Sequence, residues 1–214
     1  MITPIPTYKF LLPNAIQTNA QPNYNIMQII ACILFFIFIF YFFARKSYII
    51  GAICTVAFAN YLAINMKRFL VDEANNIDDN MARYIDWSIT TPLLLVTILM
   101  KCNITNPTVY VFFIALDVIM IYLGYLGATS KDPKSLYTFF GFSCFFYLLI
   151  FALLLVFKPP LGLFFFLLFA WAIYPILWIL HEMKRGNITN QNYDYCISAL
   201  DIFSKIGYGL ILPL

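Results

Sequence analysis

An aspartate and a lysine lie close together inside an apolar segment near the C-terminus. Asp201 and Lys205 interrupt the run at 195–214, whose other residues are mostly apolar. A charge near the centre of a bilayer costs several kcal/mol on insertion scales, so an ionisable residue there indicates a functional site. Residues four apart share one face of a helix. The pair can therefore hold a carboxylate against an amine, or against a cation built on that amine; a structural ion pair between helices is the alternative.

Further ionisable residues occur in another apolar segment. Arg83 and Asp86 are three apart and Thr90 follows by four, so all three project from one helix face. The two carboxylates and two cations of these segments form a set that is neutral overall, and an unpaired member would be costly in a low-dielectric bundle. Aromatic residues that lie beside these charges or on one stripe of another helix are Trp87, Trp171, Tyr174 and Trp178. They favour a large, flat, apolar ligand, although such a stripe is also typical of plain helix packing.

A lysine in such a pocket has a well-defined chemistry. Its free amine condenses with an aldehyde to give a Schiff base. If that base is protonated, its positive charge needs a counter-ion, which Asp86 and Asp201 could supply. The spacing of the residues does not name the aldehyde.

The composition places the chain in a membrane. Of 214 residues, 63% are hydrophobic and 11% are charged, and the mean hydropathy is +0.83. Soluble domains carry about 25% charged residues. The net charge of +3 is small and scattered, so we expect a lipid bilayer and no nucleic acid as partner. The five cysteines show neither zinc-ligand spacing nor a disulfide framework, and we expect them to be small packing residues.

The order of apolar and polar segments predicts the fold. A polar tail at 1–25 precedes a domain at 26–214 that contains seven apolar runs of about the length that a helix needs to cross a bilayer. Because no backbone group can stay unpaired in lipid, these runs predict an all-α membrane protein with a seven-helix bundle. The Lys and Arg count leaves the orientation open, since acidic residues lie on the more basic side. The expected helices are 26–44, 48–69, 81–101, 107–128, 135–157, 161–181 and 193–213.

Three segments resemble the microbial (type 1) rhodopsins, and they occur in the same order. Residues 83–95 closely resemble the third helix of that family, 171–178 the sixth helix, and 200–209 the helix that carries the retinal lysine. Weaker similarity extends through 60–62 and 117–120, so the resemblance covers all but the N-terminal tail. The short loops and the abundance of Asn, Ile, Phe and Lys resemble the rhodopsins of giant viruses.

The resemblance implies a role for each matching residue. Lys205 would bind all-trans retinal as a protonated Schiff base, with Asp86 as primary counter-ion and proton acceptor and Asp201 as second counter-ion. Arg83 would be the gate toward the outside and Thr90 a hydrogen-bond partner of Asp86. The residues implied to surround the retinal are Tyr61, Trp87, Thr91, Leu94, Asp117, Met120, Gly124, Phe140, Ser143, Trp171, Tyr174, Pro175 and Trp178. The resemblance also implies green absorption, an N-terminus outside and a C-terminus in the cytoplasm, a homo-oligomer and a host-cell membrane.

Two departures from the family pattern bear on function. In the best-known proton pumps a carboxylate seven residues after the threonine at position 90 reprotonates the Schiff base, but here that residue is Thr97. A hydroxyl is not a general acid at neutral pH, so we expect slow reprotonation. The glutamate pair that releases the proton outward is also missing, because Glu182 and Asp194 each lie one residue away from those positions.

Three functions remain open, and none is an enzyme. The first is a light-driven outward proton pump with slow reprotonation. The second is a light-gated cation channel, which is compatible with the missing donor and with the polar residues Asn60, Asn65 and Thr97. The third is a sensory photoreceptor.

Overall fold

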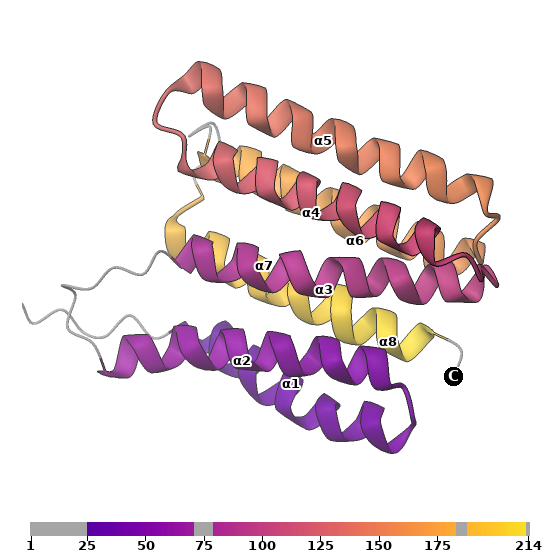
Figure 1. The fold of residues 1–214 in the computed structure, drawn as a ribbon. Helices are drawn as coiled ribbons and strands as arrows, with labels where there is room; N and C mark the ends of the chain where they lie inside the picture. The colour runs from indigo at the N-terminus through magenta and orange to yellow at the C-terminus, as the bar shows by residue number, and fades with distance from the viewer. Residues whose placement is uncertain (1–24, 71–78, 183–187, 213–214) are drawn as a thin grey trace, which may run out of the picture.

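A computed structural model describes residues 25–70, 79–182 and 188–212, which form an all-α bundle (Figure 1). The described residues make seven helical rods and no strand, so the predicted seven-helix bundle is confirmed. The predicted ends differ from the observed ends by three residues or fewer. The six regular rods are α1 (Ile26–Ala44), α2 (Tyr48–Leu70), α3 (Asp79–Lys101), α4 (Pro107–Thr129), α5 (Pro133–Val156) and α6 (Leu161–Glu182). The seventh rod consists of α7 (Asn190–Asp201), η1 (Ile202–Gly207) and α8 (Tyr208–Ile211).

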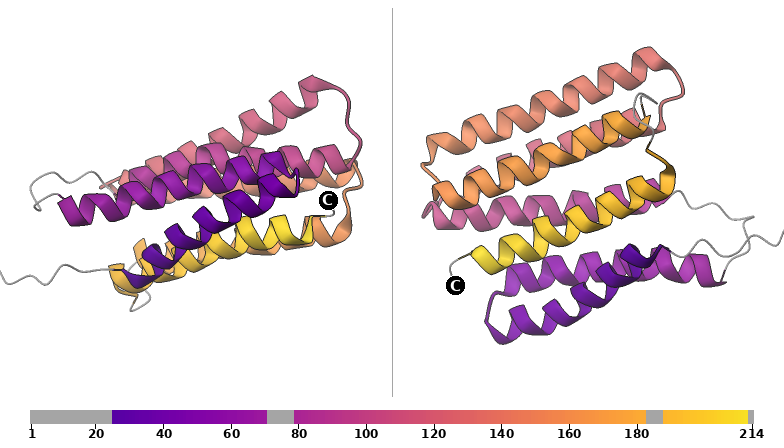
Figure 2. Two further views of the ribbon diagram at one scale, coloured as in Figure 1. Left: turned by 90° about the horizontal axis from the view of Figure 1, so that it is seen from below. Right: turned by 180° about the vertical axis from the view of Figure 1, so that it is seen from behind.

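The rods that carry the ionisable residues lie in the middle of the bundle. In Figure 1 and in the right view of Figure 2, α3 and the seventh rod run between the α1–α2 pair on one side and α4, α5 and α6 on the other. The bundle has an N-terminal end, where α1 begins, and a C-terminal end, where α8 ends. The predicted tail at 1–25 lies outside the described residues except for Asn25.

Side-chain caps explain where several helices begin. Asn25 accepts hydrogen bonds from the backbone N–H groups of the first turn of α1. Asn106 caps α4 in the same way, with a proline at the first helical position. Asp132 caps α5 by accepting a hydrogen bond from the Ser135 backbone N–H at 3.0 Å, and this bond holds the pKa of the Asp132 carboxyl below its ordinary value. Asn and Asp are preferred at these positions because they satisfy N–H groups that have no partner within the helix.

Five of the described helices are long and apolar enough to cross a membrane. They are α1, α4, α5, nearly all of α6, and the Tyr48–Met66 part of α2. The other two rods carry the buried charges Arg83, Asp86, Asp201 and Lys205, which lower their mean hydropathy. Large apolar side chains that face away from the bundle, toward a lipid environment, include Phe40, Val111, Val156 and Phe169.

The seventh rod departs from a regular α-helix around Lys205. The segment Ile202–Gly207 forms a π-helical turn, a feature that is often found at functional sites. Directly after it the rod packs tightly on α1 and α2. A Cβ atom placed on Gly209 would lie 2.5 Å from Cγ2 of Ile50 and 2.6 Å from Cζ of Phe42. Only glycine therefore fits at this position without movement of its neighbours.

Candidate functional site

The Lys205 amine lies between two carboxylates. Its Nζ donates to Oδ2 of Asp86, and Oδ1 of Asp201 lies 3.7 Å away. All three residues are at most 1% exposed. Buried charges of this kind are tolerated only when they are paired. The structure thus brings together the lysine and both carboxylates that the sequence analysis selected.

Asp201 is fixed by three donors from three other helices. Its Oδ2 accepts a hydrogen bond from the Tyr61 hydroxyl at 2.8 Å. Its Oδ1 accepts from Nε1 of Trp87 at 3.1 Å and from the Tyr174 hydroxyl at 2.6 Å. An ionised carboxylate only accepts hydrogen bonds, so three donors stabilise the ionised form. Asp201 is therefore held as a fixed anion.

Asp86 has fewer partners than Asp201. Its Oδ2 contacts the Lys205 amine, but its Oδ1 is buried and has no hydrogen-bond partner among the described residues. The Thr90 hydroxyl donates to the main-chain carbonyl of Asp86 at 2.9 Å and not to the carboxylate. The bond that the resemblance implied between Thr90 and Asp86 is therefore a main-chain bond, because a helical threonine commonly bonds to the carbonyl four residues earlier. The open oxygen leaves Asp86 able to take a proton or a water molecule.

Arg83 pairs with a carboxylate that the predicted charge set did not contain. Its guanidinium donates to Oδ1 of Asp194 at 2.6 Å, and the two side chains are 3% and 17% exposed. The guanidinium carbon also lies 5.8 Å from the ring centre of Tyr193, and the ring of His181 stacks on Tyr193 at 4.2 Å. With Asp194 the set holds two cations and three carboxylates, so the predicted neutral set of four is incomplete.

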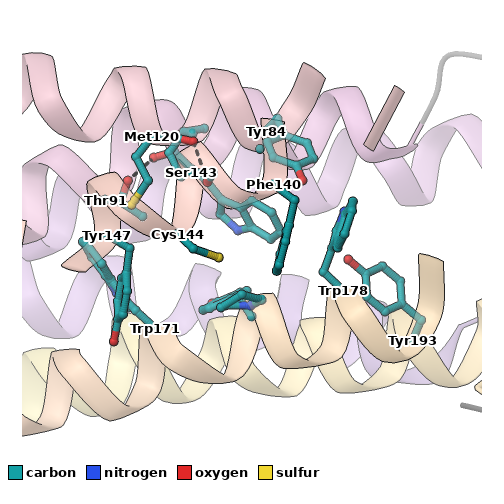
Figure 3. Close-up of a pocket in the computed structure, with 15 residues that line it drawn as sticks. Tyr84, Thr91, Met120, Phe140, Ser143, Cys144, Tyr147, Trp171, Trp178 and Tyr193 are labelled. Carbon is teal, nitrogen blue, oxygen red and sulfur yellow. Dashed lines mark hydrogen bonds between the residues drawn. The ribbon is translucent and has the colours of Figure 1, made fainter. Parts of the chain in front are cut away.

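Figure 3 shows an apolar cavity with aromatic walls, two of whose residues also bind the charge cluster around Lys205. It contains about 760 Å³ of space free of protein atoms, counting its open mouth. Trp87 and Tyr174 both line the cavity and donate to Asp201. The cavity therefore adjoins the carboxylates that hold the lysine. The predicted residues that line it are Trp87, Thr91, Met120, Gly124, Phe140, Ser143, Trp171, Tyr174, Pro175 and Trp178.

Lys205 itself and three predicted pocket residues lie outside the cavity wall. Tyr61 binds Asp201 instead, and Leu94 is buried in the core. Asp117 is fully buried and accepts a hydrogen bond at 2.6 Å from the hydroxyl of Thr91, which itself lines the cavity. Asp117 therefore lies directly behind the wall.

Five residues that were not predicted from the sequence also line the cavity. They are Tyr84, Ile121, Cys144, Tyr147 and Tyr193. Helical spacing could have found four of them, because Tyr84 lies three before Trp87, Ile121 lies three before Gly124, and Cys144 and Tyr147 lie four and seven after Phe140. No sequence signal places Tyr193 there.

The cavity and the amine together fit retinal. Phe140 and Trp178 stack at 4.5 Å with an interplanar angle of 6°, so the wall offers flat aromatic surfaces to a flat apolar molecule. Nε1 of Trp178 is buried and has no hydrogen-bond partner among the described residues. An amine flanked by carboxylates suits a protonated Schiff base formed with an aldehyde.

Seven helices around a buried lysine and an aromatic cavity are the arrangement of a microbial rhodopsin. The chain belongs to the bacteriorhodopsin-like family, whose model, described as "Bacteriorhodopsin-like protein", matches residues 20–214. Members of this family hold retinal as a Schiff base on a lysine.

Relatives and solved structures agree with the family. Archaerhodopsin-2 of Halobacterium sp. (strain aus-2) is 30% identical over 190 residues, which cover 79% of this chain and 72% of that protein. Sensory rhodopsin-1 of Halobacterium salinarum is 30% identical over 138 residues, 59% of this chain and 57% of that protein. The crystal structure of the proton pumping rhodopsin AR2 from the marine alga Acetabularia acetabulum superposes with a TM-score of 0.74 at 25% identity. The superposed residues make up 87% of this chain and 91% of the AR2 chain.

Proposed function

We propose that Lys205 carries all-trans retinal as a protonated Schiff base and that the protein is a light-driven outward proton pump. The observation that carries the proposal is the contact between the Lys205 amine and Asp86, whose second oxygen is open. The similarity to an archaerhodopsin and to a proton pumping rhodopsin supports it. The giant-virus resemblance extends the proposal to a host-cell membrane, where the chain would form a homo-oligomer.

The residues around Lys205 divide the proton chemistry between them. Retinal, when bound, supplies the absorption of light and the light-driven change that lowers the proton affinity of the Lys205 nitrogen. Asp86 lies next to that nitrogen and takes the proton on its carboxylate. Asp201 stays ionised because its three donors stabilise the anion. Trp87 and Tyr174 line the cavity and bind Asp201, so they link the proposed chromophore site to the charge cluster.

The polar atoms of the N-terminal half support release toward that end. Buried polar atoms of Asn25, Gln28, Arg83 and Asp86 have no partner within the described residues. Buried polar groups are nearly always hydrogen-bonded, so these atoms call for ordered water. Arg83 and its partner Asp194 lie on this side, and Asp194 is the carboxylate that would receive the released proton. We place the N-terminal end outside, which makes the transport outward.

Reprotonation from the C-terminal end is slow in this proposal. Thr97 stands at the position of the donor carboxylate, and its hydroxyl cannot act as an acid at neutral pH. In the described part of the chain, Asp117 is the buried carboxylate that lies between Asp86 and the C-terminal end. It accepts a hydrogen bond from Thr91 beside the cavity. Water is therefore the proton source.

A light-gated cation channel is the second candidate. The observation that favours it is the buried amide of Gln28, of which both side-chain polar atoms have no partner among the described residues. The neighbouring Asn65 amide binds the Gln28 main-chain carbonyl at 3.2 Å and ties α1 to α2. A hydrated passage lined by such amides would accept small cations as well as protons.

Photocurrent in a voltage-clamped, retinal-supplied cell tests the proposal. The pump predicts a light-induced current that stays outward at every membrane potential and disappears in Asp86→Asn, while the visible absorption of the variant remains. A current that reverses and follows an imposed cation gradient would establish the channel. A normal visible band and photocycle without any current would favour a sensory photoreceptor.

A further inference from the structure

The two halves of the bundle interior differ in their polar groups. The unpartnered atoms of Asn25, Gln28 and Arg83 lie between Lys205 and the N-terminal end. Asp117, whose Oδ1 also has no partner among the described residues, lies on the C-terminal side of Asp86. Beyond it, toward the C-terminal end, the packed interior is apolar, and within it the hydroxyls of Thr97 and Tyr208 meet. Fully buried apolar side chains of that half are Phe42, Ile50, Ile53, Ile98 and Leu99. A proton that comes from the C-terminal end must pass this dry region.

The hydrogen bond between Thr97 and Tyr208 has a defined direction. The two hydroxyl oxygens are 2.9 Å apart, and the residues are 4% and 0% exposed. The Thr97 hydroxyl also donates to the Leu94 carbonyl at 2.7 Å. A hydroxyl has a single hydrogen, so Tyr208 is the donor in its bond with Thr97. The hydrogen of Tyr208 therefore points to α3.

The bond joins the two central rods between the lysine and the C-terminal end. Thr97 follows Asp86 by eleven residues in α3, which is about 16 Å along a helix. Tyr208 follows Lys205 by three residues and comes directly after the π-helical turn. The next residue, Gly209, is the point at which the rod presses on Phe42 and Ile50. The Tyr208–Thr97 bond and the close packing at Gly209 therefore hold the same part of the interior together, between Lys205 and the C-terminal end.

We propose that the Tyr208–Thr97 hydrogen bond is a clamp that controls the entry of water from the C-terminal end. It thereby sets the rate at which the Lys205 nitrogen regains its proton, and this inference rests on the proposed function. In the controlled step an O–H bond of water breaks, the proton binds to the nitrogen, and hydroxide returns to the bulk at the C-terminal end. Tyr208 keeps its own proton throughout. It is a positioning residue, because it acts by holding α3 against the seventh rod.

Recovery of the resting absorbance after a light flash tests the clamp. Tyr208→Phe and Thr97→Val each remove the bond, and each should recover roughly three- to fivefold faster than the wild type. This factor corresponds to the loss of one neutral hydrogen bond. The double variant should be no faster than either single variant, because both remove the same bond. Thr97→Ser keeps the hydroxyl and should recover like the wild type.

A matched control exists at the same end of the bundle. The hydroxyl of Tyr110 in α4 donates to the Ile104 carbonyl in the loop before α4 at 2.8 Å, so this bond does not join α3 to the seventh rod. Tyr110→Phe should leave recovery unchanged. All variants should keep the wild-type absorption maximum, because neither Tyr208 nor Thr97 lines the cavity.

Any other outcome contradicts the proposal that this bond is a clamp. Slower recovery in Tyr208→Phe would show that the hydroxyls relay the proton. Unchanged recovery would show that the bond is structural alone, and additive acceleration in the double variant would show that the two residues act separately. A wild type without a visible band or photocycle would refute the proposed function itself, and the wild-type measurement alone separates that failure from failure of the clamp.

Discussion

Replacing Tyr61 by phenylalanine should destabilise the protein more than an ordinary loss of a tyrosine hydroxyl. The Tyr61 hydroxyl is the hydrogen-bond donor to Oδ2 of Asp201, at 2.8 Å, and both residues are at most 1% exposed. Hydrogen bonds to charged groups contribute about 1.5–3 kcal/mol. The variant would leave the oxygen of a buried anion without this donor. We therefore expect the free energy of unfolding to fall by about 1.5–3 kcal/mol.

Tyr147 supplies the matched control for this change. Its hydroxyl donates to the neutral carbonyl of Leu168 at 2.6 Å and joins α5 to α6. Neutral side-chain bonds between membrane helices average about 0.6 kcal/mol, so Tyr147→Phe should lose about that amount. The assay is reversible unfolding of both variants in mixed detergent micelles. Equal losses in the two variants would refute the conclusion that Asp201 is held as an anion by charge-assisted bonds.

Three further predictions concern other carboxylates. Asp86→Asn should shift the visible absorption to longer wavelength, because a negative counter-ion stabilises the cationic ground state; an unchanged spectrum across pH would make Asp201 the dominant counter-ion. Asp194→Asn removes the ionic partner of Arg83 and should delay the appearance of the released proton, measured with a pH dye after a flash; wild-type timing would exclude Asp194 from release. The lowered pKa of Asp132 means that its cap stabilises the fold fully above about pH 3.9 and loses this effect as the pH falls through the lower folded-state value. Asp132→Asn does not titrate, so the melting temperature of the wild type should fall relative to this variant in acid; a constant difference between them would contradict this.

The seven-helix fold was predictable because each helix coincides with a largely apolar run, and several helices also begin at a capping residue. Apolar runs of membrane length define the helices, and residues such as Asn106 and Asp132 mark where they begin. The π-helical turn at Ile202–Gly207 was not predictable. A change from α- to π-helical hydrogen bonding over six residues is not reported by the spacing of apolar residues along the chain.

The charged centre was predictable in part for a physical reason. A charge inside an apolar run must find a partner, so Asp86, Asp201 and Lys205 could be grouped from the sequence. The pairing of Arg83 with Asp194 could not be derived in this way, because Asp194 lies near the polar start of its helix, where a carboxylate needs no buried partner. The Tyr208–Thr97 bond was missed because it depends on the phase of the rod after the π-helical turn.

The central claim is that Lys205 carries the chromophore, and absorption after addition of all-trans retinal tests it most directly. Lys205→Ala removes the amine, while Lys205→Arg keeps a cation between Asp86 and Asp201 but does not condense readily with the aldehyde. Circular dichroism of the retinal-free proteins checks that both variants fold. We expect a visible band in the wild type and none in either variant. A visible band that persists in a folded Lys205→Ala protein would contradict the account.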